Sequence, residues 1–141
     1  MNNTNIDEAV GVALRSDVIF VSAGGSSTRD FKTSYQDTGA EEIDDNIIRD
    51  MDCGEGFDRA SLDLLGRQME LLESLKKTKK PIVIVYIEGR PLNKVWASEN
   101  ADALLTAYYP GQEGGLSIAD VLFGDYNPEG LLLVSVPRYV G

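Results

Sequence analysis

Apolar residues in this chain follow two kinds of spacing, which alternate along its length. A spacing of three or four residues predicts helices, whereas short and nearly continuous apolar runs predict strands buried on both faces. The first helix begins after Thr4 or Asn5 and carries Ile6, Val10, Ala13 and Leu14. Further helices are predicted at residues 66–78, 95–100 and 116–123. Strands are predicted at residues 17–22, 82–87, 103–109 and 131–136.

The alternation of strands and helices predicts one domain over residues 1–141. The expected fold is α/β, a flavodoxin-like three-layer sandwich with a mostly parallel sheet. Doubly wound domains usually begin with a strand, but here a helix comes first. We therefore expect the sheet to lack its first strand, which would leave one edge unpaired. A long acidic loop at about residues 28–58 interrupts the pattern, and loops of that length are commonly functional.

The composition excludes several classes of function. A formal net charge of −10 argues against nucleic acid and anionic membranes as partners. No apolar run approaches the roughly 20 residues that a membrane-spanning helix needs. Residues 1–8 lack the basic and apolar parts of a signal peptide, so the sequence gives no cellular location.

The residue types also limit the chemistry. The chain has no histidine, which excludes Ser-His-Asp and Cys-His catalysis and the commonest zinc ligand. Cys53 is the only cysteine, and without an internal disulfide partner or an imidazole base we interpret it as having no catalytic role. Acid–base chemistry would therefore depend on carboxylates, lysines or tyrosines.

Two short motifs fail the tests for a cofactor or metal site. Residues 24–27, Gly-Gly-Ser-Ser, follow a predicted strand but lack the spacing of a phosphate-binding loop. They form either a plain turn or a loop that faces a substrate. Residues 50–61 resemble a calcium loop but have Glu55 where glycine is required and Ser61 where the bidentate glutamate belongs. We expect neither a metal ion nor a cofactor.

The main candidate for chemistry is the segment Gly54-Glu55-Gly56-Phe57-Asp58-Arg59. Gly54 and Gly56 give the backbone conformations that other residues avoid, so Glu55 can be presented to a partner. Asp58 and Arg59 are close enough in sequence to orient the loop and to set its charge. From composition alone, Glu55 could equally be an ordinary surface glutamate.

Several motifs, in one order along the chain, resemble the C-terminal α/β sandwich domain of glycoside hydrolase family 3. They are the segments at residues 54–64 (GEGFDRASLDL), 80–85 (KPIVIV), 89–92 (GRPL), 100–103 (NADA), 109–115 (YPGQEGG), 119–128 (ADVLFGDYNP) and 136–138 (VPR). The chain departs from the family pattern at residues 64–66 and 130–133, where prolines and an arginine that relatives carry are missing. The resemblance covers nearly the whole chain.

This resemblance implies a retaining β-glycosidase, typically a β-glucosidase, that acts on β-linked glucosides or oligosaccharides. It assigns Glu55 as the general acid/base, while a separate N-terminal barrel domain supplies the aspartate nucleophile. The chain alone would then be inactive. Full-length relatives are often periplasmic or secreted.

The remaining candidates have weaker support. Tyr109 is the best sugar-facing aromatic residue, although Trp96, Tyr108 and Tyr109 are all more readily explained by packing. Glu113 precedes a predicted helix and is interpreted as structural, in capping or loop bracing. Two other functions stay open. One is a non-catalytic assembly module that forms a homodimer through its unpaired sheet edge. The other, based on topology alone, is a flavin or nucleotide binder.

Overall fold

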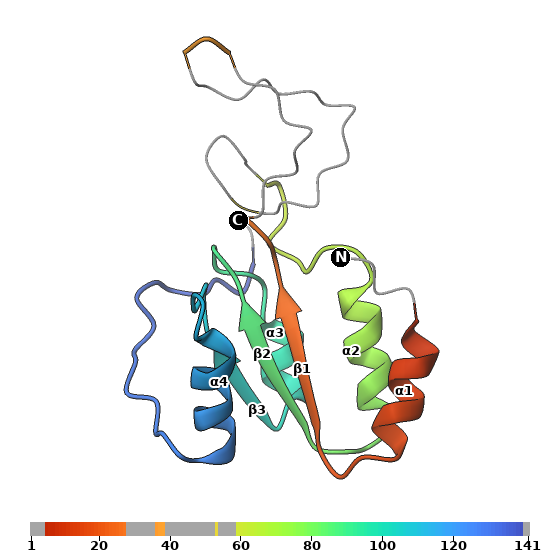
Figure 1. Ribbon diagram of the computed structural model, residues 1–141. Helices are drawn as coiled ribbons and strands as arrows, with labels where there is room; N and C mark the ends of the chain where they lie inside the picture. Colours follow the sequence, from red (N-terminus) through yellow and green to blue (C-terminus); the bar gives the residue numbers. More distant parts are fainter. Residues whose placement is uncertain (1–4, 28–35, 39–52, 54–58, 140–141) are drawn as a thin grey trace.

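The computed structural model describes residues 5–27, 36–38, 53 and 59–139 (Figure 1). Most of the predicted acidic loop lies outside these residues, and so do four of the predicted site residues, Gly54, Glu55, Gly56 and Asp58.

The described chain is an α/β domain built on a parallel sheet of three strands. The elements in order are α1 (Ile6–Leu14), β1 (Ile19–Gly24), α2 (Gln68–Lys76), β2 (Ile82–Ile87), α3 (Val95–Asn100), β3 (Ala103–Thr106) and α4 (Gly114–Phe123). The strand order is β1-β2-β3, with Ile19 opposite Ile82 and Val83 opposite Ala103. The predicted fold class, a mostly parallel α/β sandwich, is confirmed.

Helices cover the two faces of the sheet unequally (Figure 1). On one face, α2 and α3 pack on the central strand, where the core includes Leu72, Leu75, Ile84, Tyr86 and Ala97. Helix α1 lies beside α2 and contributes Ala13 to this core. On the other face, α4 reaches β1 through a contact between the rings of Phe20 and Phe123, whose centroids are 6.0 Å apart.

One edge of the sheet agrees with the expectation of a missing strand. Within the described residues, β1 pairs with β2 and with no other strand. The amides of Ile19 and Gly25 donate to Pro81 and Ile87, so the odd-numbered residues of β1 direct their backbone groups towards β2. The backbone groups of Phe20, Ser22 and Gly24 therefore point to the outer edge.

Most element boundaries agree with the sequence pattern to within a few residues. Asn5 caps α1 as predicted, because its side chain accepts a hydrogen bond from the Glu8 amide at 3.1 Å. The strand predicted at residues 103–109 ends at Thr106. Tyr108 has a φ of 50°, a left-handed conformation that does not continue a strand.

The strand predicted at residues 131–136 is wrong. The structure has no strand there, and the side chains of Leu131 and Leu133 are each 88% exposed. Residues 128–138 instead run past α3 and β3, where they border a groove together with Leu104 and Leu105. An apolar run indicates a buried strand only where a neighbouring surface receives its side chains, and Leu131 and Leu133 are left almost fully exposed.

Candidate functional site at the carboxyl end of the sheet

The ends of the three parallel strands bring together the loops in which ligands of such sheets usually bind. Backbone hydrogen bonds continue past the strands, from the Gly25 amide to the Ile87 carbonyl at 3.0 Å and from the Glu88 amide to the Tyr108 carbonyl at 3.2 Å. The loops after β1, β2 and β3 therefore lie side by side at this edge. Each loop contributes to the candidate site.

Cys53 joins this edge through a contact that the sequence did not reveal. Its Sγ lies 2.7 Å from the Tyr109 hydroxyl, within hydrogen-bonding distance for sulfur. Cys53 is 6% exposed, whereas the Tyr109 side chain remains 43% exposed. Tyr109, predicted to bind substrate or to orient the loop, is thus linked to the residue that precedes Gly54.

Gly89, in the loop after β2, makes room for this contact. A Cβ atom at Gly89 would lie 2.4 Å from Cys53 Sγ and 2.5 Å from Cε2 of Tyr109. Real Cβ contacts are essentially never that short, so any other residue would force the cysteine and the tyrosine to move. The absence of a side chain at Gly89 allows both residues to pack on the end of β2.

Arg59, predicted to orient the loop, is held at the downstream end of the segment at residues 54–59. Its Nη2 donates a hydrogen bond of 2.6 Å to the backbone carbonyl of Asp63. The Asp63 carboxylate accepts hydrogen bonds from Ser61 Oγ at 2.8 Å and from Asn93 Nδ2 at 2.9 Å. These two hydrogen bonds, Ser61 first, lower the pKa of Asp63 below its ordinary value.

Asn93 extends this connection to the backbone. Its backbone amide donates to the Leu62 carbonyl at 2.7 Å. Its side-chain Oδ1 accepts from the backbone amide of Val95 at 3.0 Å, at the start of α3. The segment that follows the Glu55 motif is therefore attached to the loop between β2 and α3.

A buried ion pair stabilises that same loop. Lys94 Nζ donates a hydrogen bond to the Glu88 carboxylate, and both side chains are almost completely buried. The second Glu88 oxygen accepts from the Leu92 amide at 3.2 Å. Lys94 Nζ also lies 4.8 Å from the centre of the Tyr86 ring. Burial, with a contribution from the charge of Glu88, raises the pKa of Tyr86 to about 12.

A second buried polar contact fixes the end of β1. Gln68, the first residue of α2, accepts a hydrogen bond from the Gly24 amide and donates one to the Gly24 carbonyl, both at 2.8 Å. Gly24 has a φ of 141°, and a Cβ there would lie 1.9 Å from the Ile87 carbonyl oxygen. The first residue of the Gly-Gly-Ser-Ser motif is therefore a close-packing position at the end of a strand.

The other candidates have simpler positions. Trp96 packs against the hydrophobic core, which supports the packing interpretation for that residue. Glu113 occupies the N-cap position of α4, where its side chain makes no capping hydrogen bond and its carbonyl accepts from the Ser117 amide at 3.1 Å. Several residues with clear structural contacts were missed from sequence, among them Cys53, Gln68, Glu88, Asn93 and Lys94. A buried pair such as Glu88 and Lys94 leaves no sequence signal beyond opposite charges six residues apart.

The described residues offer neither a metal centre nor a membrane helix. They contain no group of three or more Asp, Glu or Cys side chains placed to hold a metal ion. No helix among them is both long and apolar enough to cross a bilayer.

The comparison with known sequences assigns the chain to a family. A sequence profile described as the glycosyl hydrolase family 3 C-terminal domain matches residues 1–141. The chain belongs to glycosyl hydrolase family 3.

Its relatives in this family are much longer proteins. A β-xylosidase from Formosa agariphila is 51% identical over 89 residues, which are 63% of this chain and 12% of that protein. A periplasmic β-glucosidase from Salmonella typhimurium is 38% identical over 136 residues, which are 96% of this chain and 15% of that protein. The chain therefore spans less than one sixth of the length of these two relatives.

Solved structures of the family agree with the fold. The crystal structure of a β-glucosidase from Kluyveromyces marxianus is 30% identical, with a TM-score of 0.72 over 98% of this chain and 14% of that one. The same yeast enzyme in complex with glucose gives 31% identity and a TM-score of 0.71. This chain thus corresponds to one α/β domain of these larger glycosidases.

Proposed function

We propose that this chain is the acid/base domain of a retaining β-glycosidase of the β-glucosidase type, with Glu55 as the general acid/base. The observation that carries the proposal is family membership over the whole chain, together with the Gly-Glu-Gly-Phe-Asp-Arg motif. The proposed substrates are β-linked glucosides or oligosaccharides, whose O-glycosyl bond is hydrolysed. The names of the relatives, β-glucosidases and β-xylosidases, support that class.

The proposed reaction divides between two domains. A retaining glycosidase uses two carboxyl groups about 5–5.5 Å apart, one as nucleophile and one as proton donor. Glu55 would protonate the glycosidic oxygen as the nucleophile attacks the sugar, and would then take a proton from the water that releases the sugar. The nucleophile would come from a barrel domain, so we expect this chain alone to be inactive.

The residues around Glu55 would have supporting roles. Gly54 and Gly56 would give the loop its conformation, while Asp58, Arg59 and Tyr109 would orient the loop or contact the sugar. The positions of Arg59 and Tyr109 at the carboxyl end of the sheet support this part of the proposal. Glu113 would brace the start of α4 through its backbone.

A domain exchange tests the proposal. This chain would replace the matching domain of the Salmonella β-glucosidase, and hydrolysis of an aryl β-glucoside would be measured. We expect the chimera to be active and the chain alone to be inactive. In the chimera, Glu55→Gln should lower kcat by about 10²- to 10⁴-fold, the usual contribution of general acid–base catalysis.

The matched control is Glu73→Gln, which changes an exposed glutamate on α2 in the same way. This variant should keep the activity of the parent chimera. Full activity of Glu55→Gln, or turnover by the chain alone, would contradict the proposal.

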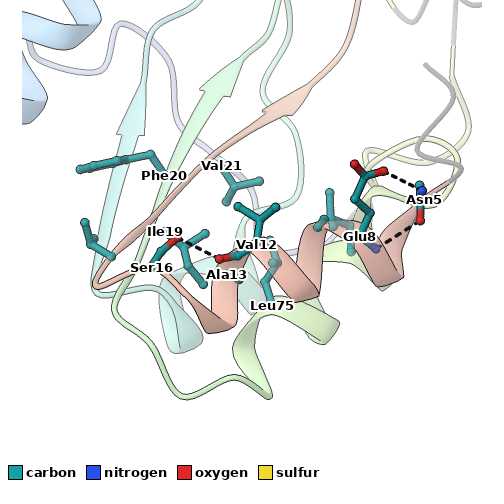
Figure 2. Close-up of a pocket in the computed structure, with 12 residues that line it drawn as sticks. Asn5, Glu8, Val12, Ala13, Ser16, Ile19, Phe20, Val21 and Leu75 are labelled. Atoms are coloured by element: carbon teal, nitrogen blue, oxygen red, sulfur yellow. Dashed lines mark hydrogen bonds between the residues drawn. The ribbon is translucent and has the colours of Figure 1, made fainter.

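A second candidate function is assembly of two copies through the unpaired edge of β1. One observation favours it, a groove along this edge between α1 and β1 (Figure 2). Figure 2 shows Val12, Ile19 and Val21 along the groove, next to the edge whose backbone groups point outwards. Such an edge can pair with a strand from another chain.

Light scattering across a range of concentrations tests this alternative. Self-association through the edge should be lost in Ser22→Pro, because proline removes an outward-pointing amide, and should persist in Ser22→Ala. A monomer at all concentrations would rule the assembly function out.

A further inference from the structure

We propose that Tyr109 and Asn93 are positioning residues that attach the two ends of the Glu55 motif to two neighbouring loops, the one after β3 and the one between β2 and α3. This inference rests on the proposed function, because it concerns how the proposed proton donor is oriented. Five residues, 54–58, separate Cys53 from Arg59. Both flanking residues have defined contacts, and these contacts lead to neighbouring loops at the carboxyl end of the sheet.

The upstream attachment is the contact between Cys53 and Tyr109. The Sγ–Oη distance of 2.7 Å and the burial of the cysteine fix the chain two residues before Glu55. Gly89 admits both side chains onto the end of β2, so the attachment has three members from three separate segments. Because a chain extends by at most about 3.6 Å per residue, a fixed Cys53 limits where a residue two positions later can be placed.

The downstream attachment runs through Asp63 and Asn93. Arg59 donates to the Asp63 carbonyl, and Asn93 Nδ2 donates to the Asp63 carboxylate. The backbone amide of Asn93 also donates to the Leu62 carbonyl. Asn93 therefore holds residues 62 and 63 by side chain and by backbone.

The loop between β2 and α3, which carries Asn93 and packs against Cys53 and Tyr109 through Gly89, is itself firmly held. Gly89 and Asn93 lie four residues apart, and between and beside them the buried Glu88–Lys94 pair and the Leu92 amide close the loop on the core. A catalytic group must be placed closely, since a displacement of about 1 Å can reduce the rate about 100-fold. A loop fixed to the sheet is a suitable support for such a group.

The first experiment tests the upstream contact in this chain directly. Cys53 is the only cysteine, so its rate of reaction with an aromatic disulfide reagent reports how often it is exposed. Tyr109→Phe should raise that rate about five- to tenfold, as expected from losing one hydrogen bond. Tyr139→Phe, at an exposed tyrosine elsewhere, should leave the rate unchanged. An unchanged rate in Tyr109→Phe would overturn the upstream attachment.

The second experiment uses the Salmonella chimera and tests positioning for catalysis. Protonation matters most for substrates with poor leaving groups and least for dinitrophenyl glycosides. Tyr109→Phe should therefore lower kcat/KM, which reports the step that cleaves the glycosidic bond, about tenfold or more for phenyl β-glucoside and less than about twofold for the dinitrophenyl substrate. Asn93→Asp should behave in the same way, because it removes the donor to Asp63 but keeps the acceptor for Val95. Cys53→Ser should lie closer to the parent than Cys53→Ala.

These results separate the two proposals. Suppose that Glu55→Gln abolishes the reaction with phenyl β-glucoside, but the Tyr109 and Asn93 variants lower kcat/KM equally for both substrates. The positioning roles then fail and the proposed function stands. If Glu55→Gln has no effect, the proposed function fails, and the catalytic part of this inference fails with it. A merely structural role for Tyr109 would change kcat/KM alike for both substrates.

Discussion

The side-chain amide of Gln68 hydrogen-bonds to both backbone groups of Gly24, a residue 44 positions earlier in the chain. Gly24 belongs to β1, and these two groups point away from β2. The glutamine thus supplies, at one position, the hydrogen bonds that a neighbouring strand would supply. It also fixes the start of α2 against the carboxyl end of the sheet.

Loss of this contact should destabilise the domain. Gln68→Glu is nearly isosteric but cannot donate to the Gly24 carbonyl, and we expect it to lower the free energy of unfolding by about 2–4 kcal/mol. The control is Glu73→Gln, on the exposed side of the same helix, which should change stability by less than about 0.5 kcal/mol. Urea unfolding followed by circular dichroism measures both. Equal stabilities would show that the buried amide contributes little.

Two glycine substitutions should have opposite effects on the stability of the fold. Gly24→Ala should cost about 3 kcal/mol or more, because its Cβ would overlap the Ile87 carbonyl and its φ of 141° disfavours side chains. Gly115→Ala lies in α4 with no atom within 4 Å of the new Cβ, so it should stabilise by up to about 1 kcal/mol. Thermal unfolding of the pair gives the comparison. A Gly24→Ala protein as stable as the parent would contradict the close packing of β1 on β2.

The buried pair of Glu88 and Lys94 should show strong coupling. Lys94→Met leaves the Glu88 carboxylate buried without its cation, which should cost about 3–5 kcal/mol. Adding Glu88→Gln removes that charge while keeping an acceptor for the Leu92 amide, so the double variant should be more stable than Lys94→Met alone. A double-mutant cycle in urea measures the coupling. Simple additivity of the two changes would argue against a direct ion pair.

Asp63 should contribute to the loss of stability in acid. Hydrogen bonds from Ser61 and Asn93 lower the pKa of Asp63 below 3.8 in the folded chain. Because the pKa of Asp63 is lower in the folded state, its ionised carboxylate stabilises the fold above about pH 3.8. This stabilisation is lost as the pH falls through the folded-state pKa. Between about pH 5 and about pH 2, Asp63→Asn should therefore lose less stability than the parent, as measured by urea unfolding at each pH. Identical losses in the two proteins would exclude the effect.

Much of the fold could be predicted from the apolar pattern. The continuous run at residues 82–87 is the central strand, and the spaced apolar residues of α1 and α2 face the core. The pattern failed at residues 131–136, where three consecutive leucines suggested a strand but all three lie exposed. Hydrophobicity alone does not specify the partner surface that a strand requires.

The polar framework of the site was much harder to predict. Cys53 and Tyr109 are 56 positions apart, and Gln68 reaches a residue 44 positions away, so no local spacing reveals either contact. Arg59 and Tyr109 were predicted from a motif and from a strand end, and both lie at the carboxyl edge. The role of Glu55 stays a prediction, since that residue lies outside the described part of the chain.

The order of the strands has a consequence for folding kinetics. β2 pairs with β3 across about 20 residues, whereas β1 pairs with β2 across about 60. The longer closure costs about 1 kcal/mol more in chain entropy. We therefore expect a nucleus of β2, α3 and β3 to form early and β1 to join it late, so that shortening the connection between β1 and α2 would accelerate refolding.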